Sequence, residues 1–378
     1  MESGSGLDRK PCSLFARDSE SCIIVPTDNN RESAERGEAK CIHDARCRKA
    51  RGRVRFHGVR RRQQQEYRQC RIDKRVQQAI EAMGFRPHAG ARGLRLGRTH
   101  IIGMVVQDLT NPFFVEVLRG VEDEAIKNGY EIIICNSNGQ SDLELKHLDA
   151  LYAQRVDGVL LAPSDSYGAR EVLVRHQAPI VFVDCVPMRA KVMCVVTDNF
   201  EASYEATRYL IGLGHQRIAV ISGRLVHSTS IDRVEGYRKA MQEVNLPIRG
   251  DYLKHGDSNI ESGYRFGLAL LKSSEPPTAI FTLNNRMTLG ILQALRELRI
   301  RCPERVSVLG FDDSDWAAVF NPALTAVGQP TDELGKRAVQ LLLQSIRTAE
   351  EGTEVEARQV LLKSSLRIRG STGPPPKA

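Results

Sequence analysis

The sequence lacks the features that would place the protein in a membrane or direct it out of the cell. No run of about 18 consecutive apolar residues occurs in it, so we expect no membrane-spanning helix. Its first ten residues are polar and contain no apolar stretch that could form the core of a secretory signal peptide. Apolar residues nevertheless make up 41% of the 378 residues, which is typical of a globular protein. We therefore expect a cytoplasmic protein of about two or three domains.

The sequence also lacks the motifs of metal sites and of enzymes. Its nine cysteines form no C-x-x-C pair, and no H-x-x-x-H pair follows them, so we expect no zinc site. It contains no G-x-S-x-G turn, no phosphate-binding P-loop and no His/Glu metal motif, which argues against catalysis and against a cofactor. Four cysteines lie in or beside apolar runs, where we expect buried free thiols: Cys135, Cys185, Cys194 and Cys302.

Positive charge is concentrated in one short segment near the N-terminus. The segment from Ala45 to Arg75 holds 13 lysines and arginines against Glu66 and Asp73, a net charge of +11 in a chain whose total is +8. The remainder is therefore slightly acidic. The first 75 residues show no hydrophobic periodicity, and their composition indicates a disordered, arginine-rich arm. Such an arm binds polyanions by charge alone, without recognising sequence.

From residue 76 onward, short apolar runs alternate with amphipathic stretches. We expect strands at 101–106, 130–135, 158–162, 180–184, 194–197, 217–222, 279–283 and 306–310, and the first two helices at 112–128 and 143–154. Asn111 can cap the first of these helices, and Pro112 suits its first turn. This alternation predicts an α/β protein with parallel sheets covered by helices on both faces. Ligands of such sheets bind beyond the carboxyl ends of the strands.

Short motifs in a fixed order give residues 76–370 a family resemblance. The motifs are RVQQAIEAMGFRPHA (75–89), ARGL (91–94), GRT (97–99), DLTNPFF (108–114), RVDG (155–158), TDN (197–199), GH (214–215), GFDD (310–313) and QP (329–330). In this order and spacing they resemble the lactose-repressor (LacI-type) family of bacterial transcription regulators.

The resemblance implies a fold and a division into domains. The family has two doubly wound parallel-sheet lobes of the periplasmic-binding-protein type, which close on a ligand by a hinge motion. We expect this sensing domain at 100–370, followed by a tail at 371–378. The resemblance places the first lobe at about 100–200 and 330–357, and the second lobe at about 201–329 and 358–370.

The resemblance also implies which residues hold a ligand. Asp312 and Arg233 match the family positions that bind sugar, where a carboxylate and a guanidinium pair with adjacent hydroxyls. The alternative is that both make structural salt links near the hinge. Asn284 matches an asparagine whose amide can both donate and accept. Its neighbour Asn285 stands where the family usually has aspartate, which departs from the pattern.

Further candidates each have a structural alternative. Asp198 either contacts the ligand or caps the helix that follows it. Phe113, Phe114 and Trp316 can stack on a sugar ring, but core packing is the alternative, and for Phe113 we favour it. Two more polar residues complete the expected set: Ser164 and Gln329.

Residues 75–99 resemble the last headpiece helix and the hinge helix, by which the family contacts DNA. Leu94 matches a leucine that wedges into the minor groove, and Ala91 and Arg92 lie beside it. Gly90 and Gly93 would make this helix unstable alone, so we expect it to form only on operator DNA. The alternative is an exposed leucine in a linker.

The family's helix-turn-helix is not recognisable in residues 1–74. Advancing the reading frame by one nucleotide across residues 56–74 permits STVSAVVNNKNIVSAESTS, which resembles the missing recognition helix at the right spacing from Val76. We therefore interpret residues 1–74 as a frame-disrupted headpiece remnant. The alternative is a natural, disordered basic arm.

Together these features predict a ligand-responsive DNA-binding repressor, not an enzyme. We expect a homodimer that binds operator DNA in a frame-intact form, because two half-sites require two headpieces. A sugar or related small molecule would be the effector. The alternatives are a sugar-binding subunit of a transport system and a cytoplasmic sugar sensor that has lost DNA binding.

Overall fold

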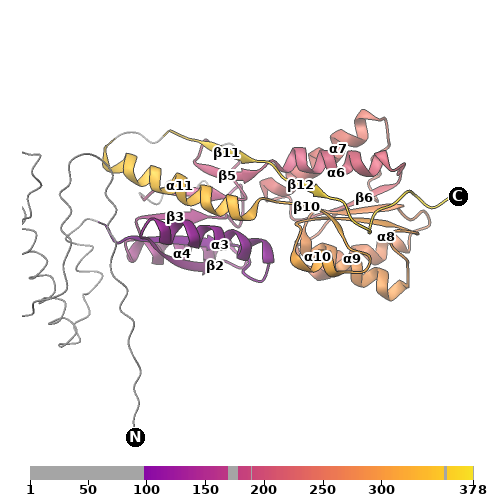
Figure 1. Ribbon diagram of the computed structural model, residues 1–378, viewed down its shortest axis with the longest axis horizontal. Helices are drawn as coiled ribbons and strands as arrows, with labels where there is room; N and C mark the ends of the chain where they lie inside the picture. The colour runs from indigo at the N-terminus through magenta and orange to yellow at the C-terminus, as the bar shows by residue number, and fades with distance from the viewer. Residues whose placement is uncertain (1–97, 169–177, 189, 353–355, 378) are drawn as a thin grey trace, which may run out of the picture. The chain divides into compact units, whose positions relative to one another are not determined.

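The computed structural model describes residues 98–168, 178–188, 190–352 and 356–377, which belong to one compact unit of the chain. Within them, two parallel-sheet lobes confirm the predicted fold class (Figure 1). No helix among these residues is long and apolar enough to cross a membrane. The expectations for the basic arm, the last headpiece helix and the hinge helix fall on residues 1–97, outside the described residues.

The first lobe is built on a six-stranded parallel sheet in the order β11-β5-β4-β3-β1-β2. Its strands are β1 (Ile101–Val106), β2 (Glu131–Asn136), β3 (Gly158–Leu161), β4 (Ile180–Val183), β5 (Cys194–Thr197) and β11 (Gln359–Leu362). Its helices are α3 (Pro112–Lys127), α4 (Ser141–Ala153) and α11 (Thr331–Glu350). Ile102, Met104 and Val106 of β1 pack with α3 and α11, whereas Val105 packs with α4 on the other face. This two-residue alternation explains why β1 is apolar throughout.

The second lobe repeats this plan with a six-stranded sheet in the order β12-β10-β9-β8-β6-β7. Its strands are β6 (Ile218–Ser222), β7 (Leu253–His255), β8 (Ala279–Thr282), β9 (Ser307–Phe311), β10 (Thr325–Gly328) and β12 (Ser365–Arg367), of which only β12 pairs antiparallel. Its helices are α6 (Asn199–Gly212), α7 (Ser228–Glu243), α8 (Ile260–Leu271), α9 (Asn285–Leu298) and α10 (Asp315–Val319). Helices α6 and α7 share one core with the sheet, and α8 and α9 share another.

Three short segments carry the chain between the lobes. They are Asp198 between β5 and α6, Gln329 and Pro330 between β10 and α11, and residues 363–364 between β11 and β12. Because every connection between the two sheets passes through them, these segments form the hinge. Two residues that the sequence marked as ligand contacts, Asp198 and Gln329, thus belong to the hinge.

The chain leaves the first lobe later than we expected. The expected second lobe resumed at residue 358, but β11 pairs with β5, with Gln359 opposite Cys194, so the first lobe extends to Leu362. The expected tail at 371–378 is also partly incorporated into the second lobe. Ser371 Oγ donates to the Val308 carbonyl at 2.6 Å, and Gly373 N donates to Ser307 Oγ at 3.0 Å. The shortness of β11 accounts for the first error, and the second arises because residues 371–373 are held to β9 by hydrogen bonds outside any strand.

Helices α3 and α11 approach each other closely at two glycines. A Cβ added to Gly335 would lie 2.2 Å from the Val117 carbonyl oxygen, and one added to Gly120 would lie 2.3 Å from that of Asp332. The backbones therefore touch where a larger side chain would separate them. This contact joins α3, which begins at the cleft, to α11, which begins at the hinge.

Candidate functional site

A cavity of about 440 Å³ lies between the lobes, at the carboxyl ends of strands from both sheets. Its volume is within the usual range for small-molecule sites, roughly 300–1,000 Å³. The first lobe contributes Gln107, Asp108, Thr110, Asn111, Phe113, Phe114, Asn138, Gly139, Asp184 and Cys185. The second lobe and the hinge contribute Gly223, Arg224, His227, Thr229, Ser230, Arg233, Asp257, Ser258, Asn259, Leu283, Asn284, Arg286, Asp312 and Gln329.

Two aspartates occupy equivalent places in the two lobes. Asp184 follows the last residue of β4, and Asp312 follows the last residue of β9. Both have left-handed backbone conformations, with φ values of 65° and 73°. Such a conformation is uncommon outside glycine, although aspartate tolerates it better than most residues. Each strand therefore ends in a turn that directs a carboxylate to the cavity.

Burial governs the protonation of Asp184. Its pKa is raised to about 6, chiefly by desolvation, while the charge of Arg233 lowers it and that of Asp312 raises it. The thiol of Cys185 donates to Asp184 Oδ2 at 3.5 Å, and burial in turn raises the pKa of that thiol. Carboxylates from both lobes and one guanidinium thus act on each other electrostatically in the cavity.

Arg233, on α7, is buried and held by several groups of its own lobe. Its Nε donates to Asn199 Oδ1 at 2.7 Å, and its Nη1 donates to the Leu283 carbonyl at 2.8 Å. Its guanidinium carbon lies 3.6 Å from the centroid of the Phe311 ring, within cation–π range. These contacts fix the guanidinium, and its Nη2 has no hydrogen-bond partner among the described residues.

Asp312 and Gln329 form a pair that orients the glutamine amide. Gln329 Nε2 donates to Asp312 Oδ1 at 2.6 Å. The amide oxygen of Gln329 is buried and has no hydrogen-bond partner among the described residues. The carboxylate thereby orients the amide, with its nitrogen towards Asp312 and its oxygen away from it. Among the described residues, neither Asp312 nor Arg233 forms a salt bridge of the kind that the structural alternative would require.

Three other expected residues line the cavity with part of their side chains committed elsewhere. Asn284 caps α9 by accepting from Met287 N at 3.0 Å, so one acceptor position of its amide oxygen is occupied by the helix. Phe113 and Phe114 line the cavity but also pack in the core of the first lobe, with ring centroids 5.1 Å apart. Each ring therefore forms part of the cavity wall and also part of the core of the first lobe.

The remaining three expected residues do not line this cavity. Ser164 is buried in the first lobe, where its backbone N–H donates to Glu144 and its hydroxyl contacts Ser137. Asp198 caps α6 by accepting from Glu201 N at 3.0 Å, so the capping alternative describes its place. Trp316, on α10, packs against the core of the second lobe.

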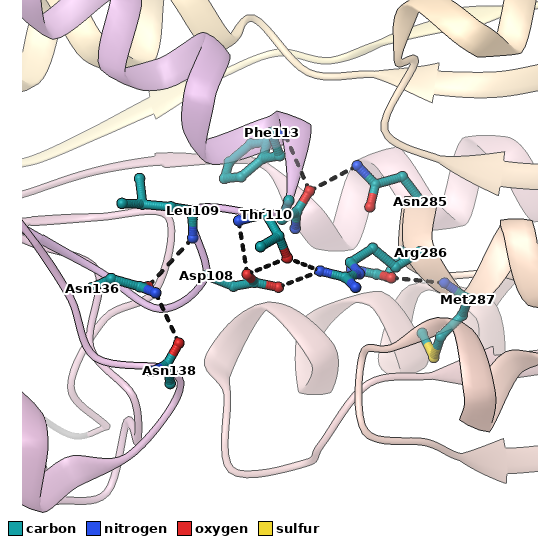
Figure 2. A network of polar contacts seen from close by, with 11 residues as sticks. Asp108, Leu109, Thr110, Phe113, Asn136, Asn138, Asn285, Arg286 and Met287 are labelled. Carbon is teal, nitrogen blue, oxygen red and sulfur yellow. Dashed lines mark hydrogen bonds and ion pairs between the residues drawn. The ribbon is translucent and has the colours of Figure 1, made fainter.

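Polar contacts join the two lobes beside the cavity. Arg286 of α9 donates to Asp108 Oδ2 at 2.7 Å and also contacts the Thr110 hydroxyl (Figure 2). Asn285 Nδ2 donates at 2.9 Å to Asn111 Oδ1, which also accepts from Phe113 N as the cap of α3 (Figure 2). An aspartate at 285 could not donate to this oxygen, so the departure from the family pattern has a structural role.

The cavity includes residues that the sequence did not single out, chiefly Asp184, His227 and Thr229. A signal existed for Asp184, because it is the first polar residue after an apolar run, at the carboxyl end of a parallel strand. His227 and Thr229 lie at the start of α7 and had no comparable signal. No group of three or more His, Cys, Asp or Glu among the described residues could hold a metal ion.

The two lobes and the cavity between them define a protein of the periplasmic-binding-protein type that senses a small molecule. The family model for periplasmic binding proteins and the sugar binding domain of the LacI family matches residues 99–365. The chain belongs to the LacI family of transcriptional regulators.

Its relatives are repressors, which agrees with the expectation that the chain is not an enzyme. The HTH-type transcriptional repressor PurR of Vibrio vulnificus (strain CMCP6) is 34% identical over 284 residues, covering 75% of this chain and 85% of that protein. The ribose operon repressor of Escherichia coli (strain K12) is 36% identical over 277 residues, covering 73% and 84%. A LacI family regulator from Enterococcus faecium, solved with bound ribose, has a TM-score of 0.64 and 30% identity, covering 72% of this chain and 99% of that chain.

Proposed function

We propose that the cavity binds a sugar or a related polyhydroxyl compound as the effector of a repressor. The arrangement of Asp312 and Gln329 is the observation that carries the proposal. One carboxylate oxygen of Asp312 fixes the amide of Gln329. The buried oxygen of that amide lacks a hydrogen-bond partner among the described residues. A buried polar group without a hydrogen bond costs roughly 1–3 kcal/mol, and a ligand hydroxyl would remove that cost. Two neighbouring charged groups, Arg233 and Asp184, offer further partners for vicinal hydroxyls.

Ribose is a reasonable first candidate for the effector. A ribose operon repressor is among the relatives, and a family member has been solved with ribose bound. The cavity of about 440 Å³ is large enough for a monosaccharide. We expect the effector to favour one arrangement of the lobes about the hinge and so to change affinity for operator DNA.

The proposed DNA contacts depend on the N-terminal segment. Leu94, Ala91 and Arg92 would form the hinge helix, and a frame-intact headpiece would precede it. All of these lie outside the described residues. We propose a homodimer, because each of two operator half-sites requires one headpiece. A regulator that binds chromosomal DNA would act in the cytoplasm.

Isothermal titration calorimetry with D-ribose tests the ligand proposal. Asp312→Asn removes the charge that holds Gln329, and hydrogen bonds to charged groups contribute about 1.5–3 kcal/mol. We expect affinity to fall about tenfold to a hundredfold. Asp198→Asn is the matched control, because asparagine also caps helices and residue 198 lies outside the cavity. Equal affinity of wild type and Asp312→Asn would refute the assignment of Asp312.

A further inference from the structure

Helix α7 differs from three other helices of the second lobe in how its N-terminus is capped. The side chain that directly precedes each of α6, α8 and α9 accepts a hydrogen bond from a backbone N–H of the first turn. These capping residues are Asp198, Asn259 and Asn284. The side chain of His227, which precedes α7, makes no such bond. The first N–H of α7, that of Ser228, donates instead to the hydroxyl of Ser166 at 3.1 Å, and Ser166 follows strand β3 of the first lobe.

Two more hydrogen bonds join the same segments of the two lobes. Ser166 N donates to the Val226 carbonyl at 3.0 Å. Val186 N, beyond the end of β4, donates to Ser228 Oγ at 3.1 Å. Ser166 and Ser228 are only 0% and 6% exposed, so water cannot easily take the place of these bonds while the lobes stay together. The start of α7 is therefore capped across the boundary between the lobes.

The first lobe holds Ser166 in place through contacts of its own. The Ser166 carbonyl accepts from Met188 N at 2.7 Å. Two residues earlier, Ser164 N donates to the buried carboxylate of Glu144, and the Ser164 hydroxyl lies 2.8 Å from that of Ser137. In a hinge motion the hydroxyl of Ser166 therefore moves with the first lobe, whereas the N–H that it caps moves with the second.

The turn that Ser166 caps also carries part of the cavity wall. Thr229, Ser230 and Arg233 of α7 line the cavity. If the lobes move apart about the hinge, Ser166 Oγ separates from Ser228 N, and the first turn of α7 loses the protein partner of one N–H group. Loss of a capping side chain destabilises the start of a helix. Closure of the lobes and ordering of this wall of the cavity should thus favour each other.

We propose that Ser166 is a positioning residue of the cleft, which caps α7 from the opposite lobe only when the lobes are closed. Ser166 does not line the cavity and acts through the first turn of α7. The inference rests on the proposed function, because a bound sugar is what would favour closure. The capping bond then adds to the affinity for any ligand that favours the closed arrangement.

Sugar affinity is the first test, measured by calorimetry on the full-length protein with D-ribose, D-xylose and D-glucose. For the sugar that wild type binds most tightly, Ser166→Ala should weaken affinity about threefold to tenfold, because closure then buries the Ser228 N–H without its acceptor. Ser371→Ala is the matched control. The Ser371 hydroxyl is also buried and accepts from a backbone N–H, that of Thr325 at 2.8 Å, but both residues lie in the second lobe. We expect this control to lower the melting temperature and to leave sugar affinity unchanged.

Ser228→Ala tests the same boundary from the second lobe. It removes the hydroxyl that accepts from Val186 N, and alanine is a good helix former. We therefore expect sugar affinity to fall about threefold to tenfold, as with Ser166→Ala, with no loss of thermal stability in the absence of sugar.

Amide hydrogen exchange is the second test, because it reports on the capping bond itself. With saturating sugar, the Ser228 N–H should exchange about tenfold faster in Ser166→Ala than in wild type. The N–H of Ser262 is the internal control, since it is capped within its own lobe by Asn259 Oδ1 at 2.8 Å. Its exchange rate should be the same in both proteins.

The outcomes separate the inference from the proposed function. Unchanged affinity in Ser166→Ala, or an unchanged exchange rate at Ser228, overturns the inference and leaves the sugar-binding function in place. An equal loss of affinity in Ser371→Ala also overturns it, because the effect would then follow from lost stability and not from the contact between the lobes. If wild type binds none of the three sugars, the proposed function fails, and the inference that rests on it fails with it.

Discussion

Arg286 in the second lobe and Asp108 in the first lobe form an ion pair of 2.7 Å beside the cavity. Both side chains are partly buried, with 24% and 37% of their surfaces exposed, so solvent screens the pair only in part. The adjacent bond between Asn285 and Asn111 joins the same two elements, the start of α9 and the start of α3. Together these contacts stabilise the arrangement of lobes in which the cavity is formed.

Removing this ion pair should therefore weaken effector binding although neither residue need touch the ligand. Partly exposed ion pairs contribute about 0.2–1 kcal/mol, so Arg286→Met should lower affinity for D-ribose up to about fivefold. The reason is that the arrangement of lobes in which the cavity is formed becomes less populated in the free protein. Calorimetry at low and high salt measures the effect. The charge-swapped double variant Asp108→Arg/Arg286→Asp should recover part of the loss, and no recovery would indicate that the charges act separately.

Asp184→Asn should stabilise the protein at neutral pH. Burial raises the pKa of Asp184 to about 6 in the folded protein, so folding favours its protonated form. The stability that this gives is present below the unfolded pKa of about 4 and is lost as pH rises through about 6. A shift of this size corresponds to at most roughly 3 kcal/mol.

Thermal melts of both proteins between pH 4 and pH 8, about 2 units either side of this raised pKa, test the prediction for Asp184. Asp184→Asn should exceed wild type at the upper end, and the difference should shrink towards pH 4. Comparing the two proteins at each pH cancels the contributions of other groups, such as His227, whose lowered pKa acts in the opposite direction. A variant that is less stable than wild type at pH 8 would show that the ionised carboxylate is stabilised by its surroundings.

Gly335→Ala should destabilise the first lobe. The added methyl group would overlap the Val117 carbonyl of α3, 2.2 Å away, and the two helices would have to separate. Overpacking of this kind costs about 1–3 kcal/mol. Gly212→Ala, at the exposed end of α6, is the matched control because nothing lies within 4 Å of its added Cβ. Chemical denaturation should show a loss for the first variant and a neutral or small stabilising effect for the second.

The unaltered chain should not recognise an operator, whereas a chain with the reading frame restored in its N-terminal segment should. Base recognition requires a helix placed in the major groove. Residues 60–65 of the unaltered chain are instead three arginines followed by three glutamines. Their binding would be sequence-blind, with dissociation constants of roughly 10⁻⁴–10⁻⁶ M at physiological salt. Footprinting both chains on the gene's upstream region is the measurement. If the unaltered chain protects a discrete palindrome, the basic arm is a DNA-binding element and the interpretation of residues 1–74 as frame-disrupted is wrong.

The sequence predicted the fold well because the buried strands carry continuous apolar runs. β1, β5 and β8 occur within a few residues of their expected positions, whereas β7, β10, β11 and β12 were not anticipated. The missed strands β7, β11 and β12 contain no fully buried residue, so they lack the buried apolar run that marks the predicted strands. The last crossing between the lobes was misplaced for this reason.

The candidate site was less predictable because it depends on how two lobes meet. Arg233, Asn284, Asp312 and Gln329 were reached through the family motifs, and all four line the cavity. Asp198 has the same polar character, but a local hydrogen bond to Glu201 N commits it to capping a helix.

The position of Gln329 in the hinge has a kinetic consequence. When two bodies rotate about a pivot, points near the pivot move least. Gln329 lies in one of the three crossing segments, and its partner Asp312 follows the adjacent strand β9. We therefore expect a sugar to dock on this pair while the cleft is still open, before groups of the first lobe such as Asp184 reach it. We expect the hinge pair to govern the rate of capture and the groups of the first lobe to govern the residence time.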